Sequence, residues 1–231
     1  MSAIQVDTVT AEDFLSDLKD RIDAHWNFSN RHTIVMGGVV INPQSIGLPA
    51  KKPASARSGG TAVKRKKPQI IEAKTIGFEN ITFLGSVSFE DMESVLLRFN
   101  SVNFHDGFTF TDFVGGWISI QDCRLNYLTF YSSTCTTIDL CSIQGLRTTG
   151  RGGSNMNTRS IDISGLEVTE RADFENLSVD ELITVGHRRF KAPLVSLEDP
   201  VLALQFQLAG TPVHVRTEVA RMMIARSRPL K

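Results

Sequence analysis

The sequence predicts a mainly β protein in which residues 68–208 wind as a three-sided parallel coil of about 6 to 7 turns. Pairs of apolar residues that flank one other residue recur at intervals of 20 to 23 residues. Two further series of such pairs fall between them, which predicts three short strands per turn. Alternate side chains of a strand point to opposite faces, so each pair faces an interior. One turn cannot bury that face alone, and stacked turns are therefore expected.

The first series sets the predicted register, and its members should lie directly above one another. A second series begins with Ile81/Phe83 and a third with Val87/Phe89. Parallel connections of this kind are expected to be right-handed. The pairs of the first series are Ile76/Phe78, Leu97/Phe99, Ile118/Ile120, Ile138/Leu140, Ile161/Ile163, Ile183/Val185 and Leu204/Phe206.

The segment 1–42 is predicted to be a separate N-terminal arm. Thr10 and Asp13 have the spacing of a capping box, and an amphipathic helix over about residues 10–26 should follow. A strand pair or one bent strand is expected over 33–42, where two glycines interrupt an apolar stretch. The apolar face of the helix is predicted to bind a partner, through Phe14, Leu18, Ile22 and Trp26.

The segment 43–67 is predicted to be a basic linker, because it is rich in Pro, Gly, Ser, Ala and Lys with almost no large apolar side chain. Residues 51–67 hold seven Lys and Arg and no acid, which leaves about −7 on the rest of a chain of zero formal charge. The cluster resembles a bipartite nuclear import signal, and it could equally contact nucleic acid phosphates or an acidic subunit. The basic residues concerned are Lys51, Lys52, Lys64, Arg65, Lys66 and Lys67.

Residues 209–231 are predicted to cap the far end of the coil with a helix over 217–226.

Apolar residues make up 41% of the chain and charged residues 22%, which are values typical of a globular protein. No signal-like start or apolar run of about 18 residues occurs, so an intracellular soluble protein is expected, in a virion if the source is viral. The three cysteines and five histidines lack metal-ligand spacing, and no metal or cofactor is predicted.

Two features could carry chemistry. Asp139 and Asp162 lie between the apolar pairs of successive predicted turns, where their carboxylates would stack roughly 5 Å apart. That separation suits the nucleophile and general acid of a retaining glycosidase, although short acidic side chains on a solvated face fit the pattern as well. The glycine-rich segment 147–159 interrupts the repeat and could bind an anion or a protein partner, through Arg147, Arg151 and Arg159.

The stacked apolar pairs resemble those of the right-handed parallel β-helix proteins, which include pectate lyases, polygalacturonases, phage tailspikes and pentapeptide-repeat proteins. The resemblance covers about 140 residues and concerns the architecture. Strict five-residue repeats are not kept, and Asn157-Thr158-Arg159 and Gly186-His187-Arg188 depart from the polygalacturonase motifs. The resemblance implies a three-sided parallel β-helix, and with it a component of a phage or viral particle.

The sequence therefore favours a non-enzymatic structural or interaction protein, a rigid coil that docks into a larger assembly through self-association or other subunits. A carbohydrate-cleaving enzyme that uses Asp139 and Asp162 is one alternative. An inhibitor that presents a flat wall of the coil to a host or bacterial protein is the other.

Overall fold

The computed structural model describes nine stretches of the chain. The basic segment 51–67, Arg147, Arg151, the predicted C-terminal helix and the side chain of Trp26 lie outside the described residues. The described stretches are 5–22, 25–26, 31–48, 74–93, 95–146, 158–175, 177–183, 194–197 and 213–215.

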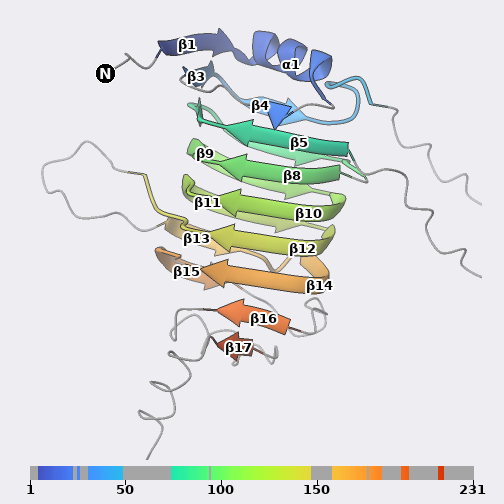
Figure 1. Cartoon of the computed structure of the whole chain (residues 1–231), viewed down its shortest axis with the longest axis vertical. Coiled ribbons are helices and arrows are strands. Elements are labelled where there is room, and N and C mark those ends of the chain that lie inside the picture. Colours follow the sequence, from blue (N-terminus) through green and yellow to red (C-terminus); the bar gives the residue numbers. More distant parts are fainter. Residues whose placement is uncertain are drawn as a thin grey trace, which may run out of the picture.

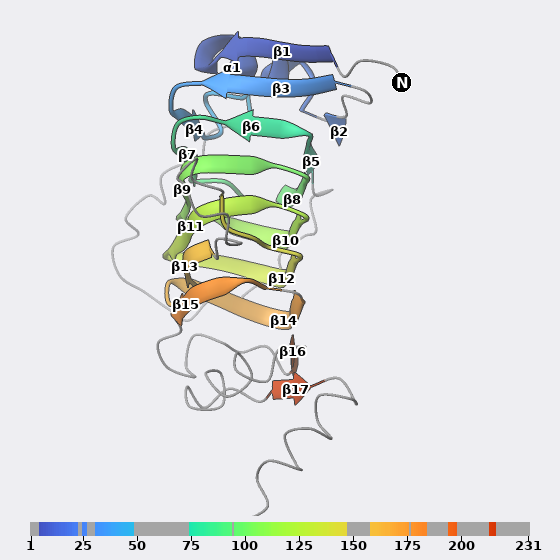
Figure 2. The ribbon, with the colours of Figure 1, turned by 90° about the vertical axis from the view of Figure 1, so that its left-hand side faces the viewer.

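The chain is mainly β and its strands form two sheets, in which every strand pair given by the structure is parallel. From β8 to β12 successive strands alternate between the sheets, so the chain winds as a coil and the strands stack in one column (Figures 1 and 2). Sheet A contains β1 (Gln5–Thr10), β3 (Arg31–Met36), β6 (Ile81–Phe83), β9 (Asn103–Thr111), β11 (Arg124–Tyr131), β13 (Thr158–Asp162) and β15 (Val179–Ile183), with β4 (Val39–Ile41) and β7 (Val87–Glu90) beside that path. Sheet B contains β2 (His25–Trp26), β5 (Lys74–Glu79), β8 (Val95–Asn100), β10 (Val114–Gln121), β12 (Ser133–Cys141), β14 (Leu166–Glu175), β16 (Leu194–Leu197) and β17 (Val213–Val215).

The three strands predicted for each turn are only partly separate. In one turn β6 and β7 are distinct strands, and both pair with the single long strand β9 of the next turn. β11 likewise covers the second and third predicted positions, with a register shift between Leu125 and Tyr127. The described strands therefore belong to two sheets, and the second and third sides of a turn merge within sheet A.

The corners between the sheets are built by short polar residues in the left-handed backbone region. Seven non-glycine residues there have φ between 46° and 55°. Asn, Asp and Ser accept this conformation because their short side chains form local hydrogen bonds. The corner N–H groups of Asn80, Ser101, Asp122 and Ser142 donate to carbonyl oxygens of Asn100, Gln121, Cys141 and Glu175 in the following turn. The seven corners are Asn80, Asp91, Ser101, Asp112, Asp122, Ser132 and Ser142.

The interior is a continuous stack of apolar side chains, as the periodicity predicted. Phe99 pairs with Phe78 on one side and with Ile120 on the other, and Ile120 pairs with Leu140. The rings of Phe78 and Phe99 are parallel, with centroids 4.9 Å apart. Similar stacks run through sheet A, in Phe83–Phe104, Phe89–Phe110 and Phe110–Phe130. Offset aromatic stacking stabilises such columns beyond the burial of their area.

The N-terminal segment is part of this stack, which corrects the prediction of a separate arm. β3 pairs with β6 and β4 pairs with β7, so both strands belong to sheet A. Helix α1 (Ala11–Asp20) is shorter than predicted, because β1 precedes it and residues 25–26 form β2. The predicted cap is present: the N–H of Asp13 donates to Oγ1 of Thr10 over 3.1 Å.

Helix α1 covers the first turn of the coil (Figure 1). Phe14 and Leu18 are each 1% exposed, and the ring of Phe14 lies 5.3 Å from that of Phe83. Ile22 is partly buried and packs against the same core. The partner-binding role predicted for Phe14 and Leu18 is thus wrong for the folded chain, because this apolar face closes the coil's own interior.

The predicted register fails after the fourth turn. Ile161 was expected above Ile138, but it pairs with Leu128 because β13 lies in sheet A beside β11. The residues that pair with Ile138 and Leu140 are Ala172 and Phe174 of β14. The coil therefore continues into β14, beyond the 147–157 segment that the structure does not describe.

Candidate functional site

One wall of sheet B carries a column of outward polar residues. Arg98 pairs with Ser119, Ser119 with Asp139, and Asp139 with Asp173. Asp162 lies in β13 of sheet A, where it pairs with Thr129. The predicted pair of Asp139 and Asp162 is therefore wrong, and the carboxylate that neighbours Asp139 is that of Asp173.

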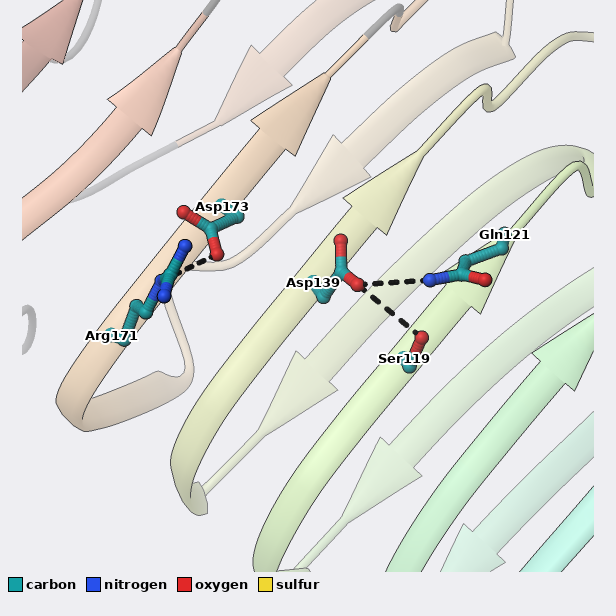
Figure 3. A network of polar contacts seen from close by, with 5 residues as sticks. All are labelled: Ser119, Gln121, Asp139, Arg171 and Asp173. Atoms are coloured by element: carbon teal, nitrogen blue, oxygen red, sulfur yellow. Dashed lines mark hydrogen bonds and ion pairs between the residues drawn. The ribbon is translucent and has the colours of Figure 1, made fainter.

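Three side chains hold these two carboxylates in place (Figure 3). Nε2 of Gln121 donates to Oδ2 of Asp139 over 3.1 Å, and Oγ of Ser119 lies 3.5 Å from the same oxygen. Nε of Arg171 is 2.6 Å from Oδ2 of Asp173. Each carboxylate thus has its own partners, and adjacent strands place the two residues about 4.8 Å apart.

The surroundings of the two carboxyl groups differ. Partial burial raises the pKa of Asp139, hydrogen bonding from Gln121 opposes the rise, and the charge of Asp173 adds to it. Asp173 is ion-paired with Arg171. A carboxyl whose pKa is raised, next to a second carboxyl group, is a feature that general acid and base catalysis uses. The same arrangement also allows two acidic side chains to lie next to each other on a protein surface without any catalytic role.

A second exposed cluster lies on the opposite wall, in sheet A. Nη1 of Arg159 donates to the hydroxyl oxygen of Tyr127 over 2.9 Å, and its Cζ lies 5.8 Å from the ring centroid. Arg159 was predicted as a partner-binding residue, and the structure places it in β13. Tyr127 is 41% exposed, and Tyr131 of the same strand is 55% exposed. We call these three residues the tyrosine wall.

The tyrosine wall borders a column of hydroxyl groups. Ser88, Thr109 and Thr129 are in register across β7, β9 and β11, and Asp162 extends the column into β13. The sequence search missed Tyr127 and Tyr131. The signal was available: both flank Thr129 at outward positions of a strand whose inward residues, Leu128 and Phe130, are apolar. A search for large aromatics at outward positions would have found them.

The cysteines have no reactive environment among the described residues. Burial raises the pKa of Cys123 and of Cys135 to about 12, and it also raises the pKa of Cys141. Both fully buried thiols line the interior. Within the described part of the chain, no group of three or more His, Cys, Asp or Glu side chains is placed to hold a metal ion.

No helix in the described residues is long and apolar enough to cross a bilayer. Comparisons with protein-family models, with curated proteins and with solved structures found no match to this chain.

Proposed function

We propose that the protein is a non-enzymatic scaffold, a rigid rod that docks into a larger assembly through an exposed wall. The observation that supports this best is the tyrosine wall, because Tyr and Arg are enriched among residues that dominate binding energy at protein interfaces. Tyr127 and Arg159 are already in contact, so little side-chain freedom remains to be lost on binding.

The interior supports the rigidity that such a role requires. Strand pairing runs without interruption from β1 to β15 in sheet A and from β2 to β17 in sheet B. The phenylalanine stacks help to fix the spacing of the walls, since they join rings of successive turns, and Phe110 stacks on Phe89 in one neighbouring turn and on Phe130 in the other. Side chains on the outward faces are therefore presented at fixed intervals.

The concrete form that we propose is a component of a multi-subunit particle, such as a phage or viral virion or tail. It is built as a three-sided parallel β-helix, in which β5, β6 and β7 supply the sides of one turn. This form extends the architectural resemblance of the repeat. The partners that we propose are further copies of the chain or other subunits.

Light scattering and electron microscopy of the purified full chain test the proposal. We expect concentration-dependent particles, which Tyr127→Ala and Arg159→Ala weaken. Trp117→Ala is the matched control, because Trp117 is an exposed aromatic of sheet B. A monomer at all concentrations, in a chain that forms no complex with other structural subunits, would overturn the proposal. A stable one-to-one complex with a host or bacterial protein would instead support the inhibitor alternative.

A carbohydrate-cleaving enzyme is the second candidate, favoured by the raised pKa of Asp139 beside the ion-paired Asp173. In that reading Asp139 is the general acid and Asp173 the nucleophile, because carboxylates about 5 Å apart suit a retaining mechanism. Release of reducing ends from a panel of acidic and neutral glycans tests it. We would then expect Asp139→Asn and Asp173→Asn each to abolish turnover, while Asp162→Asn leaves it unchanged. No turnover by the unmodified protein removes the candidate.

A further inference from the structure

Strand β1 is the end strand of sheet A, and within the described part of the chain only one of its two edges is paired. It pairs with β3 in an unbroken register from Gln5↔Arg31 to Thr10↔Met36. No strand among the described residues lies on its other side. In a parallel strand, every second residue directs its N–H and C=O groups to the same edge. The outer edge of β1 therefore presents a row of backbone donors and acceptors that no described strand pairs with.

The side chains of β1 do little to block this edge. Natural edge strands are commonly protected by Lys, Pro, bulges or a covering element. The strand Gln-Val-Asp-Thr-Val-Thr contains neither Lys nor Pro, and its pairing shows no bulge. Its one charged residue is Asp7, whose Oδ2 forms a salt bridge with Nη1 of Arg31 over 3.5 Å. Val6 is 54% exposed.

Helix α1 closes the interior at this end but leaves the edge open. Its buried residues, Phe14 and Leu18, pack on the core beside β1. In Figures 1 and 2 the strand and the helix lie side by side at the first turn, with β1 outermost in its sheet. Helix α1 thus covers the apolar interior at the first turn, but it does not cover the backbone N–H and C=O groups on the outer edge of β1.

The surroundings of the edge are acidic. Residues 5–22 contain five acidic residues and two basic ones. Glu12, Asp13 and Asp20 are exposed on α1. A second copy that approached with the same end would place acid opposite acid, which costs binding energy. A basic partner is complementary instead.

We propose that β1 binds an extended, basic segment of another protein, which adds a strand to sheet A. Main-chain hydrogen bonds to the open edge supply the pairing, as in other complexes formed by strand addition. Basic side chains flanking the added strand contact the acidic face of α1. This inference is independent of the tyrosine wall, because it uses the opposite kind of surface: an edge rather than a face.

The test uses a synthetic peptide of alternating threonine and valine with two lysines at each end, and a control peptide with glutamates in place of the lysines. Fluorescence anisotropy with the full chain should show binding of the lysine peptide that weakens as salt rises, and at least about tenfold weaker binding of the glutamate peptide. Hydrogen exchange of the unmodified protein should show new protection of the β1 amides when the lysine peptide is present. Absence of either result overturns the proposal.

Proline variants locate the binding edge. Val6 and Asp7 are neighbours, so their N–H groups point to opposite edges of β1. Val6→Pro and Asp7→Pro should therefore differ: one loses a bond to β3, and the other keeps the fold and loses at least about tenfold in peptide affinity. Val6→Thr is the matched control and should bind within about twofold of the unmodified chain. Unchanged binding in both proline variants, or a dimer that the proline variants dissociate, would contradict a foreign basic strand as the occupant.

Discussion

Replacing Phe99 by alanine should remove a large part of the stability of the coil. Phe99 is fully buried, and its ring lies 4.9 Å from that of Phe78, 5.1 Å from Phe108 and 5.5 Å from Phe89. Truncation of a buried phenylalanine costs about 3–5 kcal/mol, from lost transfer free energy and the cavity that remains. We expect the upper part of that range, because strands on both sides fix the wall of the cavity.

Urea unfolding followed by far-ultraviolet circular dichroism measures this loss. A domain's total free energy of unfolding is about 5–15 kcal/mol, so the change should move the midpoint strongly. Tyr131→Ala is the control, since it removes an aromatic of similar size from an exposed position. It should alter the free energy of unfolding by about 0.5 kcal/mol or less.

The position of the damage is a further measurable result. Turns of a repeat architecture contact only their neighbours, so destabilisation should be local. In Phe99→Ala, amide exchange should accelerate most in β5, β8 and β10, and less in β14. A loss below about 1.5 kcal/mol, or an equal rise in exchange in all strands, would refute a continuous and closely packed interior.

Three further predictions concern polar groups and thiols. Thr33→Val should raise the free energy of unfolding by about 1 kcal/mol, because the buried Oγ1 of Thr33 has no hydrogen-bond partner among the residues that the structure describes; a lower melting temperature would contradict this. The raised pKa of Asp139 means that its ionisation disfavours the folded state, so stability from this group is lost as pH rises above 3.8. Asp139→Asn should therefore gain melting temperature relative to the unmodified chain between pH 4 and pH 7, and an equal difference at both pH values would refute the assignment. Ellman's reagent should label only Cys141 of the described cysteines in the folded chain, since Cys123 and Cys135 are buried and react only after unfolding; rapid labelling of either would show that the core is open.

The apolar pairs predicted the interior of four turns from sequence alone. Leu97 and Phe99 lie in register with Ile118 and Ile120, which in turn lie in register with Ile138 and Leu140. The prediction succeeded because strand geometry fixes a side-chain period of two, so burial of one face leaves a direct trace in the sequence. The parallel arrangement followed from the regular spacing of those pairs, which lie 20 or 21 residues apart.

The number of strands in a turn can be predicted only from a sequence pattern other than the apolar pairs. The left-handed corners fall at residues 80, 91, 101, 112, 122, 132 and 142, so successive corners are 10 or 11 residues apart. Two corners per turn correspond to the two sheets. Apolar pairs cannot reveal this, because the single strand β9 carries the inward residues of both the second and the third series, Phe104 and the pair Phe108 and Phe110. The corner residues are Asn, Asp or Ser, whose pattern could have been read from the sequence.

The same corners explain why the acidic site was placed on the wrong wall. Ile161/Ile163 and Ala172/Phe174 are both apolar pairs, so burial alone does not say which of them follows Ile138/Leu140. The corner at Ser142 decides it, because its N–H donates to the carbonyl of Glu175, directly after Phe174. In a coil of two sheets, an error of one strand carries a side chain to the other wall. Asp162 consequently joins the hydroxyl column of sheet A, and Asp173 takes its place beside Asp139.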